Sequence, residues 1–364
     1  MADINNNEIT INGRVIAKRI HKNCSFLNIE TPDEVVQLLL DNNFDIPQIG
    51  SIVQVKGTKG VTNAGFPVLF VQHLNLLNTC KNPTLLNLKL KELIILKNKV
   101  ETILRNALQK EGAIEVSTNI LGKARGTSKI EPFKTQDLYG SVYFLKFTHE
   151  MELKKIIVDT QLPIFEIGKV FRNMGESRTH HHEYTVLEAQ FPYKTLSTTL
   201  TFVEKTMKEI ATCLGCNSFS EIPRYTMREI FKKLGYNFDS LTLDDQKKVY
   251  KTKIKRSLGP FFLTNPPAEW SPLTLENNDG TAKDAEFIYN GIGLAHICEE
   301  KTDAQEIERS LRKTAKQPED VDVDFIQKMY LGLPPSTGLA IGVDRSYMAF
   351  KNLVSVKNSM INTR

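Results

Sequence analysis

The spacing of hydrophobic residues changes near residue 80. Between residues 8 and 77, apolar and polar residues alternate in short runs that Gly and Asn interrupt, which is typical of β-strands. Four or five closely spaced strands of this length predict a small closed barrel over residues 1–80. Within it, the apolar run VVQLLLDNNF at residues 35–44 is predicted to form an inserted helix.

From residue 91 the apolar spacing becomes helical, and Gly112 ends this long amphipathic segment. Strand-like and helical runs then alternate without a regular βαβ order. The expected strands are residues 114–118, 142–148, 164–171, 183–191 and 285–297, and the expected outer helices are residues 200–214 and 228–235. This irregular order favours an α+β domain over residues 81–364, with a mixed, largely antiparallel sheet flanked by helices.

Composition restricts the class of protein. The start MADINNNEITING lacks the basic and apolar regions of a signal peptide, and no apolar run reaches the roughly 18–20 residues of a membrane span. The 5 cysteines are scattered and odd in number, which favours reduced thiols over a disulfide framework. We therefore expect a cytoplasmic protein without membrane association. Its net charge of +5 permits a nucleic-acid partner without demonstrating one.

Positive charge and an aromatic ring occur together in the predicted barrel. Lys18, Arg19 and Lys22 lie close in sequence to Phe26, a combination that single-stranded nucleic acid binding uses. A small barrel of this kind is typical of the oligonucleotide-binding type. The alternative is a solvated strand edge that carries charges.

The segment FRNMGESRTHHHEYTVLEAQF, residues 171–191, reads as a strand, a loop and a returning strand. Arg172 ends the first strand, where its forked donors suit phosphate oxygens. The histidines at 180–182 cannot all face one ion from a strand, because alternate side chains point to opposite faces. A metal site, a phosphate or substrate contact by one histidine, and plain exposure remain the alternatives. The C-L-G-C at 213–216 has zinc-like spacing without a second pair of ligands near it.

The segment GLPPSTGLAIGVDRSYMAF near the C-terminus supplies a second cation. Gly338 and Gly342 would let the backbone lie against a flat ligand, and Arg345 begins the following helix, where it could reach a phosphate. The alternative is a glycine packing motif.

In this order, these segments resemble the class II aminoacyl-tRNA synthetases. FRNMGESRTHHHEYT is similar to their motif 2, and GLAIGVDR is similar to their motif 3. Among them the chain most resembles the lysyl-tRNA synthetases. That likeness is carried by NGRVIAKRIHKNCSFLNI in the anticodon-binding barrel, ARGTSKIEPFKT after motif 1, PPAEWSPL, and AHICEEKTDAQE in the last substrate-binding strand.

The resemblance implies a homodimer that uses ATP and Mg²⁺ to activate an amino acid as an acyl-adenylate. It implies catalytic roles for Arg172 on the α-phosphate and Arg345 on the γ-phosphate. His180 would lie near the distal phosphates, the ring of Tyr184 would stack on adenine, and Glu286 would bind magnesium.

The resemblance also assigns the amino-acid pocket and the tRNA surface. The pocket residues it implies are Glu150, Glu188, Gln190, His296 and Glu300, whose carboxylates would hold the ammonium of lysine or a lysine-like amino acid. The tRNA-binding residues it implies are Arg14, Lys18, Arg19 and Phe26.

Several positions depart from the family pattern. They are Met174 and Gly293 in place of glutamates, Gln190, His296 and Cys298 in place of a tyrosine, an asparagine and a phenylalanine, Asn119 in place of a proline, and Ala340 in place of a glycine. Gly293 removes the second magnesium-binding carboxylate. These departures suggest a divergent or truncated paralogue and leave three functions open. They are activation with transfer to tRNA, activation with transfer to a protein or small amine, and a non-catalytic tRNA-binding or regulatory role.

Overall fold

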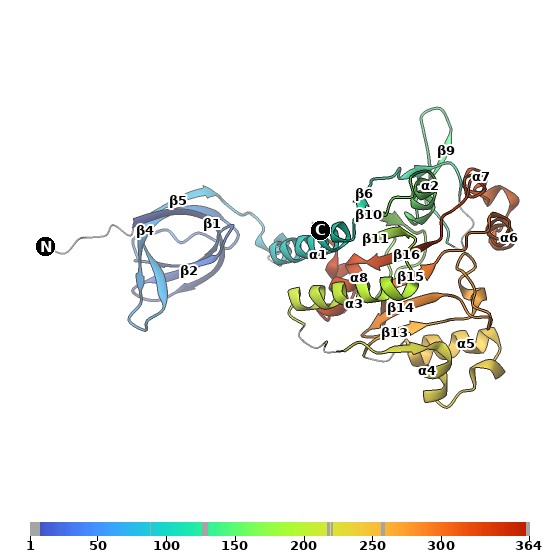
Figure 1. Ribbon diagram of the computed structural model, residues 1–364. Coiled ribbons are helices and arrows are strands. Elements are labelled where there is room, and N and C mark those ends of the chain that lie inside the picture. Colours follow the sequence, from blue (N-terminus) through green and yellow to red (C-terminus); the bar gives the residue numbers. More distant parts are fainter. Residues whose placement is uncertain are drawn as a thin grey trace. The chain divides into compact units, whose positions relative to one another are not determined.

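The computed structural model describes residues 8–361 except residues 88, 126–129, 217–218, 220 and 256–258. One compact unit ends at Lys91, and a second comprises Glu92–Ile361 (Figure 1). The boundary predicted at residue 80 remains a prediction. Among the described residues, no helix combines the length and apolarity needed to cross a membrane.

The first unit is a closed five-stranded barrel, consistent with the oligonucleotide-binding type. Its strands are β1 (Glu8–Ile20), β2 (Ser25–Glu30), β3 (Val35–Leu40), β4 (Ile52–Val61) and β5 (Pro67–Asn78), paired in the order β1-β2-β3-β5-β4. Alternate residues point inward, and the core contains Val15, Leu27, Ile29, Leu38, Leu40, Val53, Val55 and Leu69.

The helix predicted at residues 35–44 is wrong. This segment contains strand β3, which pairs antiparallel with β2 and parallel with β5. A continuous apolar run does not distinguish a buried strand from a buried helix. The strand prevails because Leu38 and Leu40, two residues apart, both fill the barrel core.

The second unit is built on an eight-stranded sheet in the order β12-β13-β14-β15-β16-β11-β10-β6. These strands are Arg224–Thr226, Pro260–Thr264, Asp284–Tyr289, Ile292–Glu299, Ser336–Gly342, Glu183–Pro192, Ile164–Phe171 and Ile114–Glu115, in that order. Neighbours from β13 to β10 are antiparallel, and only the edge strands β12 and β6 pair in parallel. The prediction of a largely antiparallel sheet is therefore confirmed.

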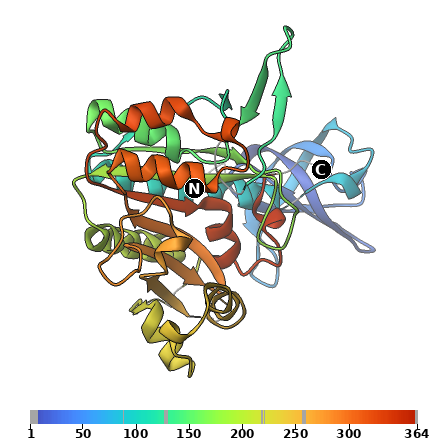
Figure 2. The same cartoon turned by 90° about the vertical axis from the view of Figure 1, so that its right-hand side faces the viewer.

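Three of the predicted strands need correction. Residues 114–118 contribute only β6 (Ile114–Glu115). Residues 285–297 form a hairpin of β14 and β15, because Asn290 and Gly291 have φ of 50° and 73° and turn the chain. Residues 142–148 contribute only β9 (Val142–Leu145), which lies in a separate small sheet with β7 (Leu121–Gly122) and β8 (Lys134–Gln136). The β8–β9 hairpin stands away from the main sheet (Figure 2).

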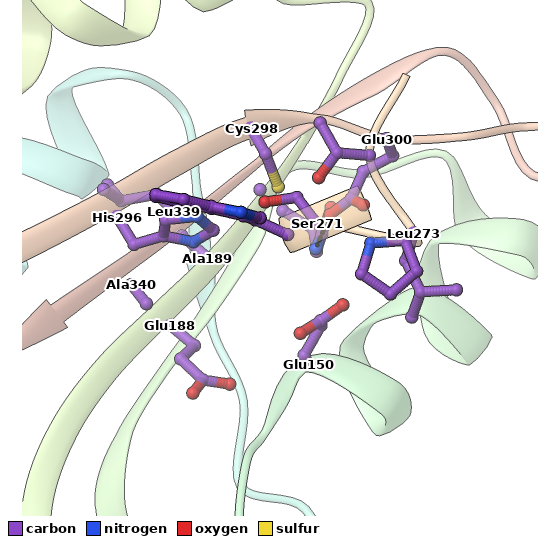
Figure 3. Close-up of a pocket in the computed structure, with 15 residues that line it drawn as sticks. Glu150, Glu188, Ala189, Ser271, Leu273, His296, Cys298, Glu300, Leu339 and Ala340 are labelled. Atoms are coloured by element: carbon purple, nitrogen blue, oxygen red, sulfur yellow. Dashed lines mark hydrogen bonds between the residues drawn. The ribbon is translucent and has the colours of Figure 1, made fainter. Parts of the chain in front are cut away.

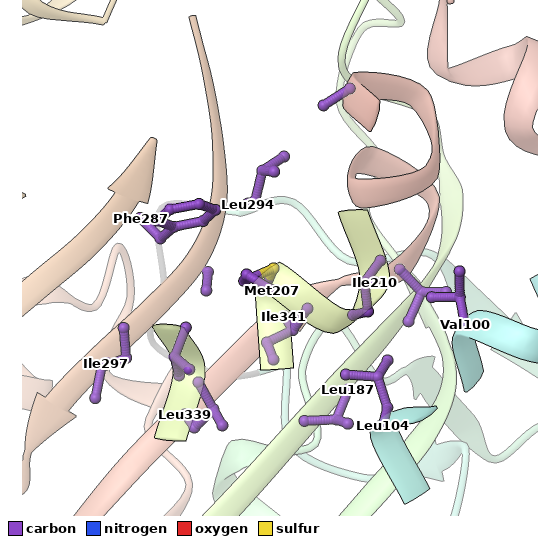
Figure 4. Packing of buried hydrophobic residues seen from close by; sticks show 14 of the residues in the cluster. Val100, Leu104, Leu187, Met207, Ile210, Phe287, Leu294, Ile297, Leu339 and Ile341 are labelled. Atoms are coloured by element: carbon purple, nitrogen blue, oxygen red, sulfur yellow. The ribbon is translucent and has the colours of Figure 1, made fainter. Parts of the chain in front are cut away.

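A hydrophobic core covers one face of the main sheet. Helices α1 (Leu90–Lys110), α3 (Leu196–Cys213) and α8 (Val343–Phe350) supply its outer side. The core side chains labelled in Figure 4 are Val100, Leu104, Leu187, Met207, Ile210, Phe287, Leu294, Ile297, Leu339 and Ile341. Intervening residues of the same strands point to the opposite face.

The remaining helices form two smaller clusters. Helices α2 (Glu150–Thr160), α6 (Ala304–Thr314) and α7 (Val323–Met329) pack with one another, and α4 (Met227–Lys233) and α5 (Leu243–Val249) pack near β13. A π-helical turn, Tyr250–Ile254, continues α5. Short 3₁₀ turns are Pro83–Leu85, Phe238–Ser240, Ala268–Trp270, Pro318–Asp320 and Val356–Ser359.

Candidate active site

Polar side chains occupy the sheet face opposite the hydrophobic core. On β11, Leu187 and Ala189 belong to the core, whereas Glu188 and Gln190 point the other way. The same alternation on β15 directs His296 toward the second face. One cavity of about 290 Å³ lies there (Figure 3). It is lined by all five predicted amino-acid residues, Glu150, Glu188, Gln190, His296 and Glu300, together with Cys298, Trp270, Ser271 and Leu273.

A buried lysine that the sequence analysis did not single out lies beside this cavity. The Lys154 ammonium is 2.6 Å from Glu150 Oε1 and 2.7 Å from Glu300 Oε2. Burial alone would lower the pKa of Lys154, but the charges of Glu150 and Glu300 outweigh it and raise that pKa. The Gln190 amide donates to Glu300 Oε1 at 2.8 Å. Both oxygens of Glu300 therefore already face a donor group.

Glu188 keeps one carboxylate oxygen available. Its Oε2 accepts from the Thr148 hydroxyl at 2.7 Å and from the His149 backbone N–H at 2.6 Å. Burial raises the pKa of Glu188, and the charge of Arg172 is among those that oppose the rise. A cation entering the cavity would therefore strengthen the ionised form of this carboxyl.

His296 brings a positive charge to the cavity. Its Nε2 lies 2.9 Å from Asp284 Oδ2, and Asp284 also accepts from the Ser271 hydroxyl. The charge of Asp284 raises the pKa of His296 to about 9. At neutral pH the side chain is therefore an imidazolium.

A second cluster joins the hairpin of β10 and β11 to α8. Arg172, which follows β10, donates from Nε to the Phe147 carbonyl at 3.3 Å and stacks 5.2 Å from the ring centroid of Tyr184. Arg345 donates from Nε to the Thr179 carbonyl in the hairpin loop at 3.0 Å. Arg172, His180, Tyr184 and Arg345 line one small cavity, so the structure brings four of the five predicted ATP residues together. The fifth, Glu286, lies outside the lining of this cavity.

The three histidines of the loop have separate partners. His180 Nδ1 lies 2.8 Å from the Ser177 hydroxyl, His181 Nε2 lies 3.1 Å from Glu176, and His182 Nδ1 lies 3.3 Å from the Arg172 carbonyl. Burial lowers the pKa of His180, and nearby cations lower it further, so that it is neutral. Across the described part of the chain, no group of three or more His, Cys, Asp or Glu side chains is placed to hold a metal ion.

Glu286, on β14, is held by residues of the π-helical turn and its end. Lys255 Nζ lies 2.9 Å from Glu286 Oε1, and the Tyr250 hydroxyl donates to Oε2. A Cβ on Gly293 would lie 1.7 Å from Glu286 Oε1, so this carboxylate fills the space above the glycine. These residues do not fit a resident magnesium centre with two carboxylates. Glu286 as a magnesium ligand stays a prediction.

Sequence reasoning missed Lys154, Asp284, Tyr250 and Lys255. Lys154 lies one helical turn after Glu150, and this spacing is the only local signal for their contact. The basic run KKVYKTKIKR contains Lys255 but does not show which lysine faces Glu286.

In the barrel unit, only part of the predicted tRNA surface forms a common groove. Arg19 lies 5.9 Å from the ring centroid of Phe26, and both line an open groove of about 810 Å³ that also exposes Phe66 and Phe70. Arg14 lies outside this groove and donates to the Gly50 carbonyl at 2.6 Å. Lys18 is exposed and also lies outside the groove lining.

Comparison with known proteins identifies the family. Residues 80–361 match the family model of class II tRNA synthetases (D, K and N), so the chain belongs to this family. It is a class II synthetase close to the lysine–tRNA ligases. The enzyme of Listeria welshimeri is 23% identical over 431 residues, which cover 97% of this chain and 86% of the relative. The enzyme of Buchnera aphidicola from Schizaphis graminum is 24% identical over 433 residues, covering 98% and 86%. That of Thermoanaerobacter pseudethanolicus is 26% identical over 431 residues, covering 97% and 86%.

Proposed function

We propose that this protein activates lysine or a lysine-like amino acid with ATP and transfers it to tRNA. The observation that carries the proposal is that all five predicted amino-acid residues line one cavity, while four predicted ATP residues line a second. Arg172 connects the two clusters, because its charge acts on the carboxyls of Glu150 and Glu188.

The charges around the first cavity favour a cationic substrate. The carboxylates of Glu150, Glu188, Glu300 and Asp284 are opposed by the cations of Lys154 and His296. A buried excess of negative charge is costly unless a cation pairs with it. The α-ammonium of an amino acid, and a second ammonium on its side chain, would reduce that cost.

The reaction needs orientation and charge neutralisation rather than a protein nucleophile. An oxygen of the amino-acid carboxylate attacks the α-phosphorus, the bond from that phosphorus to the bridging oxygen breaks, and pyrophosphate leaves with the electron pair. In our proposal Arg172 holds the α-phosphate, Arg345 holds the γ-phosphate, and Tyr184 stacks on adenine. Magnesium enters as part of the ATP substrate. Fixed cations that match the developing charge lower the barrier without reorganising during the reaction.

The test is amino-acid-dependent exchange of labelled pyrophosphate into ATP, with the standard amino acids, β-lysine and ornithine, each with and without bulk tRNA. We expect exchange with lysine or one lysine-like amino acid. Charging of tRNA would support the proposed acceptor, whereas exchange without charging would favour a protein or small amine. No exchange from a folded protein would favour the non-catalytic alternative.

We also propose that the chain acts as a homodimer, with α1 at the interface. Ile94 and Ile95 are adjacent on this helix and each 44% exposed, and an interface would remove both side chains from water. Sedimentation equilibrium would test this proposal, and a monomer at micromolar concentration would contradict it.

The barrel groove yields a prediction for tRNA binding. Phe26→Ala should weaken tRNA affinity by about tenfold to a hundredfold, because stacking of one base on an aromatic ring contributes about 1–3 kcal/mol. The matched control is Ile20→Ala, on an exposed neighbour outside the groove lining, which should change affinity less than about twofold. Fluorescence anisotropy with labelled tRNA measures both. Equal affinities for the two variants would contradict the assigned surface.

A further inference from the structure

A protein cation occupies the position beside Glu286. The Lys255 ammonium donates to Glu286 Oε1 at 2.9 Å and to the Tyr250 hydroxyl oxygen at 3.1 Å, and that hydroxyl donates to the other Glu286 oxygen. The three side chains therefore form a closed hydrogen-bonded triangle.

The absence of a side chain at Gly293 leaves space for this hydrogen-bonded triangle. The Glu286 carboxylate lies where a Cβ on Gly293 would stand, 1.7 Å from Oε1. A longer side chain on Gly293 would push the carboxylate away and disturb its contact with Lys255. The glycine at position 293, in place of a second carboxylate, therefore leaves the space in which Glu286 pairs with Lys255.

The Lys255 charge also reaches the ATP cluster. Burial is the main cause of the lowered pKa of His180, and Arg345, Lys255 and Arg172 lower it further in that order. The charges of three cations therefore act on one loop histidine. An ammonium has three donors, and Lys255 commits two of them, which leaves one for an incoming anion.

We propose that the Lys255 ammonium binds the polyphosphate of ATP at Glu286, in place of a resident divalent ion held by two carboxylates. Glu286 and Tyr250 position the ammonium and orient its free donor. As pyrophosphate leaves with the bonding electrons, the Lys255 ammonium neutralises the new charge. The role in catalysis rests on the proposed function, whereas the role in ATP binding does not.

The first test is calorimetric titration of the protein with ATP, once in EDTA and once in excess Mg²⁺. We expect the wild-type Kd in EDTA to lie within about tenfold of the Kd in Mg²⁺. Lys255→Met should raise the Kd in EDTA by about tenfold to a hundredfold, the cost of one charge-assisted hydrogen bond. The matched control is Lys253→Met, two residues away on an exposed side chain, which should change the Kd less than about twofold.

Glu286→Gln separates the two roles of the carboxylate. The amide oxygen still accepts from Lys255 and the amide N–H can donate to the Tyr250 oxygen, so the ammonium stays in position. The negative charge near the polyphosphate is removed, so the variant should bind ATP more tightly in EDTA. If Glu286 instead holds a resident ion, the wild type loses ATP binding in EDTA and Glu286→Gln weakens binding only in Mg²⁺. That pair of results would overturn the proposal, and so would a Lys255→Met variant that binds ATP as the wild type does.

Pyrophosphate exchange gives the second readout. Exchange should saturate once all the ATP carries one magnesium ion, and Lys255→Met should reduce the maximal rate about a hundredfold to a thousandfold. A further rise in rate with free Mg²⁺ would contradict a lysine in place of the ion. If the wild type exchanges with no amino acid, the proposed function fails, while the ATP titrations still decide the role of Lys255.

Discussion

Lys154→Met should lower the free energy of unfolding of the second unit by about 3–5 kcal/mol, because it leaves a buried carboxylate without its cation. The side chains of Lys154 and Glu300 are only 3% and 1% exposed, and the ammonium lies 2.7 Å from Glu300 Oε2. The Gln190 amide would remain as a donor to Glu300, but a neutral donor does not replace a charge. Urea denaturation followed by the fluorescence of Trp270, the single tryptophan, measures the loss.

The matched control is Lys155→Met, the next residue on α2. Lys155 pairs with Glu152 on the surface, where the two side chains are 24% and 40% exposed. Its removal should therefore cost less than about 1 kcal/mol. Similar losses for the two variants would show that the Lys154 contacts add little to stability.

The stability deficit of Lys154→Met should depend on pH in a defined direction. Burial already raises the pKa of Glu300 in the wild type, and Lys154 opposes the rise. Without Lys154 that pKa rises further, so the folded state binds a proton that the unfolded state has released. Such a group favours folding at low pH and loses its contribution as pH increases through the folded pKa. The deficit should shrink between pH 7.5 and 5.5, and an equal deficit at both values would contradict this account.

Local patterns sufficed for much of the fold. The change from alternation to helical spacing near residue 80 identified the barrel and α1, because strand and helix periodicities differ along the chain. The pattern failed at β3, because a short continuous apolar run is compatible with a buried strand and with a buried helix. It also failed at Asn290–Gly291, where two residues of turn chemistry divide one apolar segment into two strands.

Site residues that belong to a motif were predicted from the sequence. Site residues whose partners are brought close only by folding were missed. Glu188 and Gln190 alternate with core residues, so their shared face followed from the strand. Lys255 meets Glu286, which lies 31 residues away in sequence, and no periodicity relates the two. Lys154 on α2 likewise contacts Glu300, which is distant in sequence, and no periodicity relates these two residues. In both cases a lysine ammonium alters the charge that a ligand would encounter.

Arg172→Met should reduce pyrophosphate exchange by at least about a thousandfold, the effect of removing an arginine that neutralises charge in phosphoryl chemistry. Arg172 has the geometry for this role, because its stacking on Tyr184 and its bond to Phe147 fix the guanidinium while leaving donors free. Arg172→Lys should recover only part of the rate, since an ammonium lacks the forked donor set. The matched control is Arg309→Met, on an exposed part of α6, which should exchange at the wild-type rate.

The division of the Arg172→Met effect between kcat and KM tests the assigned role. Loss of a contact to the α-phosphate oxygens that strengthens as the bond to pyrophosphate breaks should lower kcat and kcat/KM together. Loss of a contact made equally to bound ATP should raise KM alone. The second result would make Arg172 an ATP anchor rather than a catalytic residue. Retention of more than about a tenth of the wild-type kcat/KM would contradict both roles. Loss of one charged hydrogen bond to the substrate already lowers kcat/KM by more than about tenfold.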